Sequence, residues 1–324
     1  MVSILTGGLI SFIIAIGISF GFFFPVFKEN EVQISENTTA SLLQHVENTL
    51  SLVENYMENV AATVEQNNDI QNYLKNPDAK NSTSASVRLN NLTSYMGMIR
   101  GIAIAGQNAP TIDSMTNIGA EDYKIIESDE FQEMTETGFS RSYSSVYQTK
   151  IGSKSYFTVA YARNYYLNNQ WCSIVMFVNL NNTLKDMKGL AGSSLDAWYL
   201  KDSKGKIFYE YGTDDNIADI KNLTVEIIDK EKRNEMTGDI IFYDKSATCS
   251  YEIASVIKKE TIWMAIFPYI GGLFLNLMLF LVLVLFMNYK NVNTLINPVM
   301  ILSQRMLMAA RGNLDCKVVS DRQD

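Results

Sequence analysis

The sequence predicts an α+β protein in which one long helix is followed by two antiparallel sheets, all placed between two membrane-spanning helices. Three observations lead to this prediction. Two long apolar runs, residues 4–27 and 261–288, flank the central part of the chain. A heptad pattern follows the first run. Strand-like segments separated by turns fill the rest of the central part.

Both apolar runs are long enough to cross a bilayer. No charged side chain occurs between Met1 and Phe27 or between Thr261 and Met287. A helix needs about 20 residues to cross about 30 Å of hydrocarbon, so we expect two spans. A cleaved signal peptide is the alternative for the first run, but no Lys or Arg precedes it and its apolar core is too long. Whether Met1 is the natural start is left open.

The charges outside the spans predict how the chain is oriented. Residues 28–260 carry 22 basic and 32 acidic side chains, whereas the residues after Met287 carry five basic and three acidic ones. Short cytoplasmic segments are enriched in Lys and Arg. We therefore expect a cell-membrane protein that crosses the bilayer twice, with residues 28–260 outside and the C-terminal tail in the cytoplasm. The acidic balance argues against nucleic acid as a partner.

A long stalk helix is expected over residues 30–67. Apolar side chains recur in it at steps of three and four, the spacing of a heptad seam. The seam residues are Leu43, Val46, Leu50, Val53, Met57, Val60 and Val64. Such a seam packs either on the protein's own domain or on the same helix of a second copy, and both remain open. The segment 75–86, rich in Asn and Ser and broken by a proline, is expected to be a loop.

Two sets of strands follow the helix. The strand-like segments of the first set are 99–106, 154–166 and 171–180, the last two joined by a Leu-Asn-Asn turn. Those of the second set lie in 195–212, 238–244 and 249–257. A short helix at 181–192 separates the sets. We therefore expect a membrane-distal module over 68–192 and a membrane-proximal module over 193–260.

No catalytic or metal-binding constellation is found in the sequence. The chain has one histidine, His45, and its three cysteines have no metal-binding spacing. It contains no nucleophile elbow, zinc-binding helix motif or phosphate-binding loop. We expect no cofactor, no metal and no catalytic residue in this chain. A disulfide between Cys172 and Cys249 is left open.

Two stretches behind the long helix carry a family resemblance. They read "YFTVAYARNYYLNNQWCSIVMFVNLNNTL" in the distal module and "AWYLKDSKGKIFYEYG" in the proximal one. Together with the long helix they resemble a double Cache (dCache) sensor domain, the PAS-like extracytoplasmic module of bacterial receptors, over residues 30–260. The resemblance implies that the distal module holds a ligand.

A second resemblance lies after the second span. The stretch "NPVMILSQRMLMAARGNLD" has a proline at a helix start, apolar residues at heptad spacing and then Gly-x-Leu. It resembles the first helix and connector of a HAMP domain, here a partial one over 289–324, with a generic juxtamembrane helix as the alternative. The resemblance implies a homodimer through the stalk and HAMP helices. It also implies signal relay through Pro298, Leu302, Met306, Gly312 and Leu314.

The distal module offers candidates for ligand contact. Amino-acid-binding members of the dCache family are similar in an Arg-x-x-x-Trp-Tyr stretch and a later Asp. Here "DEFQEMTETGFSRSYSSVY" lacks that triplet, and Asn179 stands where the Asp would fall. Both charges of an amino acid must be met in a dry site, so these departures count against that ligand class. The candidates are Arg141, Tyr143, Tyr147, Tyr161, Arg163, Trp171 and Asn179, with ordinary sheet surface as the alternative for each.

The resemblances imply the sensing and relay portion of a two-component sensor histidine kinase, most similar to those of Gram-positive bacteria. The partners implied are a small ligand (a carboxylate, sugar or peptide) or a solute-binding protein, together with the lipid bilayer. We expect the output domain to follow Asp324. The alternatives are a methyl-accepting chemotaxis receptor, a cyclic-dinucleotide signalling receptor, and a membrane-anchored binding or adhesion protein without output.

Overall fold

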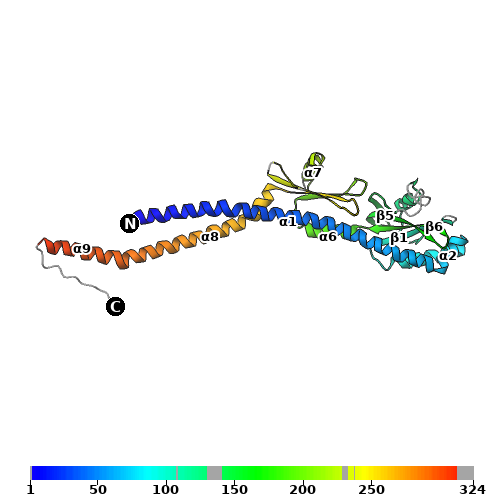
Figure 1. The fold of residues 1–324 in the computed structure, drawn as a ribbon, viewed down its shortest axis with the longest axis horizontal. Coiled ribbons are helices and arrows are strands. Elements are labelled where there is room, and N and C mark those ends of the chain that lie inside the picture. The colour runs from blue at the N-terminus through cyan, green and yellow to red at the C-terminus, as the bar shows by residue number, and fades with distance from the viewer. Residues whose placement is uncertain (1, 107–108, 130–140, 228–232, 237, 312–324) are drawn as a thin grey trace. The chain divides into compact units, whose positions relative to one another are not determined.

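The chain forms two compact units in the computed structural model (Figure 1). One unit combines Met1–Asn30 with Ile262–Asp324, and the other is Glu31–Thr261. The structure describes residues 2–106, 109–129, 141–227, 233–236 and 238–311. In its described part the first unit is wholly helical, and the second unit contains both sheets.

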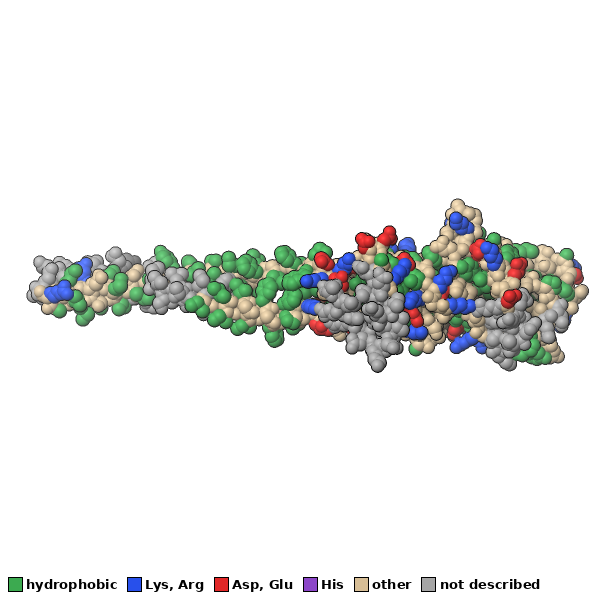
Figure 2. Space-filling model, turned by 90° about the horizontal axis from the view of Figure 1, so that it is seen from above, with side chains coloured by type: hydrophobic (Ala, Val, Ile, Leu, Met, Phe, Trp, Pro, Cys, Tyr) green, Lys and Arg blue, Asp and Glu red, His purple; other side chains and the backbone are tan. Residues whose placement is uncertain are grey.

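The helical unit contains one clear candidate for a membrane span. It is formed by parts of α1 (Val2–Gln66) and α8 (Lys259–Asn291), followed by a π-helical turn and α9. Among the described residues, only Lys259–Lys290 is a helix long and apolar enough to cross a membrane, with a mean hydropathy of 2.6. Figure 2 shows mainly hydrophobic side chains on the described part of this unit. Residues 4–27 lie within α1, and their membrane crossing remains a prediction.

Aromatic side chains of α1 and α8 pack against each other within this unit. The rings of Phe24 and Trp263 lie 4.7 Å apart, and those of Phe27 and Tyr269 lie 4.9 Å apart. Offset or tilted ring pairs at such distances are favourable. Within this unit, therefore, α1 and α8 are held together by ring packing.

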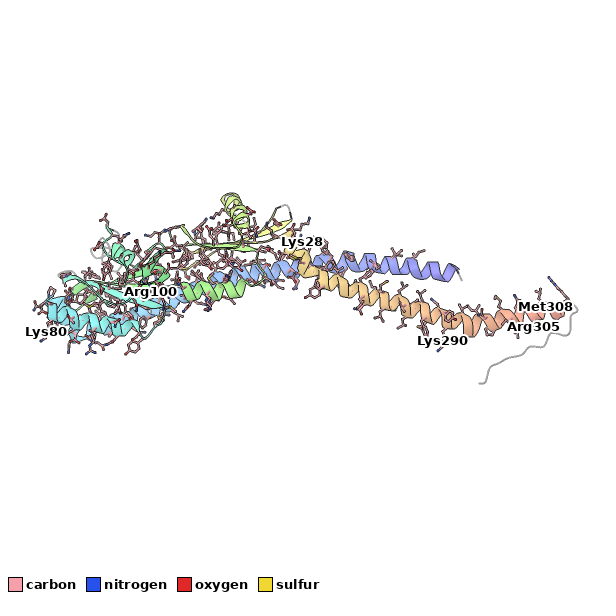
Figure 3. All side chains as sticks on the ribbon, turned by 180° about the vertical axis from the view of Figure 1, so that it is seen from behind. Lys28, Lys80, Arg100, Lys290, Arg305 and Met308 are labelled. Carbon is pink, nitrogen blue, oxygen red and sulfur yellow. The ribbon has the colours of Figure 1, made fainter. Side chains whose placement is uncertain are left out.

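The chain stays helical from α8 to the proline after it. Pro298 lies in the first turn of α9 (Asn297–Ala310), and Ile296 before that helix keeps helical φ and ψ of −75° and −46°. A π-helical turn, η1 (Val292–Ile296), comes directly before it, and Figure 3 labels Arg305 and Met308 on α9. Leu302 and Met306 are exposed in this chain. The other two predicted relay residues, Gly312 and Leu314, lie outside the described residues.

The apolar seam of α1 packs on its own chain. All seven seam residues are buried in one core cluster with strands of both sheets. Val53, Met57 and Val60 are 0% exposed. Of the two interpretations that the heptad pattern left open, the structure therefore supports the helix lying on its own domain. A dimer would have to use another face of α1.

The segment 75–86 is mostly helical, so its prediction as a loop was wrong. Helices α2 (Asn68–Lys75) and α3 (Ala79–Thr93) are separated by three residues only. Of the polar residues that suggested a loop, Asp78 is the N-cap of α3, and the serines and Asn81 lie within α3. Asn67 and Asp78 each accept hydrogen bonds from backbone N–H groups in the first turn of the following helix. Such residues favour both turns and N-caps, and local pattern does not separate the two.

The first sheet is antiparallel, with strand order β2-β1-β6-β5-β3 and β4 also paired with β5. Its strands are β1 (Ile99–Gly106), β2 (Ala109–Asp113), β3 (Arg141–Tyr143), β4 (Tyr147–Ile151), β5 (Lys154–Leu167) and β6 (Gln170–Asn179). The three predicted strands agree with β1, β5 and β6 to within one residue. The Asn168-Asn169 turn has φ of 48° and 63°, as a tight hairpin requires. The short strands β2, β3 and β4 were not predicted.

The second sheet is also antiparallel, with strand order β8-β7-β11-β10-β9. Its strands are β7 (Ala197–Lys201), β8 (Ile207–Tyr211), β9 (Arg233–Met236), β10 (Asp239–Lys245) and β11 (Glu252–Ile257). Helix α6 (Asn181–Ala191) precedes the sheet, and α7 (Asp214–Ile227), which was not predicted, follows β8. The strands of the two sheets thus lie on either side of residue 192.

Each sheet buries both of its faces. One face of each contributes to the core cluster that contains the α1 seam. The second face of the first sheet packs against α4 (Ala120–Ile126), and that of the second sheet packs against α7. Figure 1 shows α7 and α1 on opposite sides of the second sheet. The α+β class with two antiparallel sheets agrees with the prediction.

Candidate functional site

The predicted ligand-contact residues lie on opposite faces of the first sheet. Successive side chains of a strand point to alternate faces, and directly paired residues share a face. Tyr143 pairs with Tyr161, and Arg141 pairs with Arg163. These four face α1, where their contacts lie. The other three lie on the second face, and they are Tyr147, Trp171 and Asn179.

The four residues that face α1 are engaged with that helix. The rings of Tyr143 and Tyr161 lie 4.6 Å apart, and the Tyr143 hydroxyl donates to Glu54 Oε1 at 2.9 Å. Arg141 Nη1 lies 3.6 Å from Glu54 Oε2, and Arg163 forms an ion pair with the next glutamate along α1. Burial raises the pKa of Tyr143 well above its usual value, and Glu54 raises it further, so the hydroxyl remains a donor. These contacts fasten α1 to the sheet.

The second face of the sheet carries small side chains on β1 and β5, with larger ones on β6 between them. The small residues, which we call the floor, are Gly101, Ala103, Ala105, Ala160 and Ala162. Val175 and Phe177 of β6, each 0% exposed, lie between them in the register. All five floor residues are buried. In the described chain, Ile118, with Ile125 and Ile126 of α4, packs on this face. Ile118 lies directly over Gly101, because a Cβ added at that glycine would come within 2.6 Å of the Ile118 Cγ1.

A buried polar cluster closes one end of this floor. The Arg100 side chain is 5% exposed and that of Asp122 is 0% exposed, and Arg100 Nη2 lies 2.8 Å from Asp122 Oδ1. The guanidinium also donates to Thr158 Oγ1 at 2.9 Å and to the Asn117 carbonyl at 2.7 Å. The Tyr147 hydroxyl donates to Asp122 Oδ1 at 2.6 Å. Figure 3 labels Arg100.

The cluster also positions the helix that covers the floor. Asp122 Oδ2 accepts a hydrogen bond from the Gly119 N–H at 2.7 Å, at the first turn of α4. Burial raises the pKa of Tyr147 well above its usual value, and Asp122 raises it further, so its hydroxyl stays protonated. Within the described chain, two buried polar atoms here lack a hydrogen-bond partner, Arg100 Nε and Thr149 Oγ1. Unpaired buried groups are costly, so a polar group that reached these two atoms would be stabilised by hydrogen bonds to them.

Polar residues also border the floor at its other end. Asn164 and Ser173 are each 1% exposed, and the Ser173 hydroxyl donates to Asn164 Oδ1 at 2.5 Å. Trp171, near the beginning of β6, packs edge-on against Tyr166 with ring centroids 5.2 Å apart.

Asn179, at the end of β6, has a structural role, because its Oδ1 accepts a hydrogen bond from the Asn181 N–H at the start of α6.

Of the seven residues predicted from the sequence, Tyr147 belongs to the buried polar cluster. Arg100 and Asp122, the ion pair of this cluster, were not predicted. A charged residue inside the apolar strand "IRGIAIAG" was a usable signal, and so was the alternation of Gly and Ala in that strand. Most of "DEFQEMTETGFSRSYSSVY", at 130–140, lies outside the described residues. In the described chain no group of three or more His, Cys, Asp or Glu side chains is placed to hold a metal ion.

The two cysteines of the described chain are free and differ in environment. Cys172 is 1% exposed, and burial raises its pKa to about 11, whereas Cys249 is half-buried. Because the thiolate is the reactive form, we expect iodoacetamide at pH 8 to modify Cys172 at least roughly tenfold more slowly than Cys249. Peptide mass spectrometry measures both rates. Equal rates in the folded protein would contradict the packing of β6, and unfolding in urea should remove the difference.

Comparison with known proteins identifies the fold. No protein-family model matches the sequence, and no curated protein matches it. The solved extracellular domain of soHK1S-Z6, described as a histidine kinase, is 10% identical, with a TM-score of 0.50 over 75% of this chain and 99% of that one. The chain has the fold of an extracellular sensory domain.

A second solved domain is also similar to this chain. The ligand-binding domain of the Campylobacter jejuni chemoreceptor Tlp3, in complex with 4-methylisoleucine, is 11% identical. Its TM-score is 0.49, over 73% of this chain and 94% of that one. At such identities the likeness concerns the fold alone.

Proposed function

We propose that this chain is the sensing and signal-relay part of a bacterial transmembrane receptor, with a small-molecule site on the second face of the first sheet. The observation that carries the proposal is the small-residue floor bordered by buried polar side chains, in a chain with a sensory-domain fold. Ligand sites in proteins are concave, largely apolar and lined by a few convergent polar groups. The floor and its two polar ends have that composition.

The charges of the site favour an uncharged polar ligand. Arg100 is already paired with Asp122, so the polar cluster is neutral as a whole. A carboxylate would have to compete with Asp122 for the guanidinium. A hydroxyl or carbonyl group needs only a hydrogen bond, which Arg100 Nε and the Thr149 hydroxyl can provide. Of the classes considered, a sugar therefore fits better than a carboxylate.

The remaining parts of the proposal concern topology and output. Residues 4–27 and α8 would cross the cell membrane, with residues 28–260 outside. The domain boundaries, the homodimer and the partial HAMP domain of residues 289–324 are proposed on the sequence resemblances. The output is proposed to be a histidine kinase, on the resemblance of the segment after α8.

Thermal unfolding of the full chain in detergent tests the site, with panels of sugars, small carboxylates and short peptides. A ligand present at 100 times its Kd stabilises the folded state by about 2.7 kcal/mol. We expect one panel, the sugars, to raise Tm by several degrees. The variant Ala162→Leu, which fills the floor, should lose this shift, and Ala62→Leu, on an exposed face of α1, should keep it. Absence of a shift in all panels, or an equal shift in both variants, would overturn the proposed site.

A further inference from the structure

Strand β7 of the second sheet has an aspartate at each end. Asp196 comes directly before the strand and Asp202 directly after it. Each carboxylate accepts hydrogen bonds from a different part of the Glu31–Thr261 unit. Together they connect the first sheet with the beginning of the helix that we propose to cross the membrane.

Asp202 binds the loop between β3 and β4 of the first sheet. Its side chain is 1% exposed, and its Oδ2 accepts from the Val146 N–H at 2.9 Å. Its Oδ1 accepts from the N–H groups of Lys204 and Lys206, which shapes the β7–β8 turn. The Lys206 ammonium donates back to the Val146 carbonyl at 3.4 Å. Both backbone polar groups of Val146 are therefore held by the second sheet.

The same loop is continuous with the candidate ligand site. Tyr147, the next residue, donates to Asp122 in the polar cluster. On the other side, Ser144 is tied to β5, because its N–H donates to the Ala160 carbonyl and its hydroxyl accepts from the Ala160 N–H, both at 2.9 Å. A rearrangement of the floor therefore reaches Val146 without passing through α1.

Asp196 binds the beginning of α8. Its Oδ2 accepts from the Lys258 N–H at 2.6 Å, and its Oδ1 accepts from the Thr261 hydroxyl at 2.7 Å. Asp239, at the start of β10, accepts from the Lys259 N–H at 2.9 Å. Side-chain acceptors at a helix start satisfy backbone N–H groups that lack partners within the helix. β7 therefore helps to hold the first turn of α8, together with β10 and with β11, which ends at Ile257 directly before that helix.

The strand between the two aspartates is suited to transmit a displacement. Its residues from Ala197 to Leu200 are at most 1% exposed. It is hydrogen-bonded to β11 on one side and to β8 on the other. A strand rises about 3.3 Å per residue, so five residues span roughly 17 Å. Because closely packed interiors have low compressibility, such a strand moves as a unit.

We propose that β7 is a strut that couples the ligand site to α8, with Asp202 as the input contact and Asp196 as the output contact. The proposal rests on the proposed function, since it takes the cluster around Tyr147 as the ligand site. The two aspartates are positioning residues, because neither contacts the floor itself. The competing route for the same signal is α1, which packs on both sheets.

Hydrogen–deuterium exchange of the full chain in lipid nanodiscs tests this coupling without a ligand. Tyr147→Phe removes the bond to Asp122 and serves as the perturbation. We expect it to speed exchange of the amides of residues 258–261 at least threefold. In the background of Asp202→Asn, which replaces one acceptor oxygen by an amide group, this effect should vanish. In the background of Asp186→Asn, whose side chain is 64% exposed, it should persist.

A second pair of variants tests the coupling from the other end and leaves Asp202 intact. Coupling between two sites is reciprocal. Thr261→Val, which removes one contact of Asp196, should therefore speed exchange of the Val146 amide at least twofold. Thr38→Val, which removes an exposed bond within α1, should leave that amide unchanged. This pair decides the question even where Asp202→Asn prevents folding.

Two results would overturn the strut. One is an effect of Tyr147→Phe on residues 258–261 that is equal in the two aspartate backgrounds, which would assign the coupling to α1. The other is the absence of any effect of Tyr147→Phe on these amides and of Thr261→Val on Val146. Neither result depends on ligand binding. A failed ligand panel would instead overturn the proposed site and leave the strut standing.

Discussion

Replacement of Arg100 by methionine is expected to lower the free energy of unfolding by about 3–5 kcal/mol. The substitution keeps an unbranched side chain in place but leaves Asp122 without its cation. The Asp122 side chain is 0% exposed, so water cannot replace the guanidinium. Urea denaturation of the full chain in detergent, followed by circular dichroism, measures the change.

The surface of the same module provides a matched control. Arg88 also pairs with an aspartate, Asp69, at 2.9 Å, but these side chains are 53% and 38% exposed. Exposed pairs contribute at most about 1 kcal/mol, so Arg88→Met should have a small effect. Addition of Asp122→Asn to Arg100→Met should recover part of the loss, because no buried charge remains. If Arg100→Met and Arg88→Met lowered the free energy of unfolding equally, the burial of the Arg100–Asp122 pair would be contradicted.

Truncation of Leu50 to alanine is expected to lower the free energy of unfolding by about 2–5 kcal/mol, because it opens a cavity in the core. Leu50 is 2% exposed on the seam of α1, packed in the main cluster. Leu52, two residues along the same helix, is 51% exposed. Leu52→Ala should therefore change stability by less than about 0.5 kcal/mol. The same denaturation experiment compares the two.

The effect of Leu50→Ala at different protein concentrations distinguishes a seam that packs on its own chain from one that packs in a dimer. A core residue lowers the stability of each monomer, so the effect of Leu50→Ala should not change with protein concentration. A residue buried only in a dimer would lower stability more strongly in dilute protein, since dimers dissociate on dilution. A loss confined to low concentration would contradict the packing of α1 on its own sheets.

The elements with the strongest periodicity could be predicted from the sequence. Steps of three and four placed α1, and apolar alternation with an Asn-Asn turn placed β5 and β6. Elements that are short, or that have little apolar pattern, could not be predicted. Strand β3 has three residues, and α3 is a polar helix that buries only a narrow stripe, so their conformation depends on what packs against them.

In the candidate site, too, some features could be predicted from the sequence and others depend on the fold. Tyr143 and Tyr147 were both predicted as ligand contacts, but they lie on opposite faces of one sheet. Arg100 and Asp122 are 22 residues apart in the chain, and no local pattern connects them. Their pairing depends on the fold that brings α4 over β1.

The sequence by itself determined the classes of its segments, namely the apolar runs, the amphipathic stalk and the alternating strands. These properties depend on neighbours within a few residues, and periodicity records them directly. Only the tertiary structure decided which partner covers the seam, which strand face carries the floor and which charges pair. Those outcomes depend on strand register and long-range packing, since a shift of one residue turns every side chain of a strand to the other face.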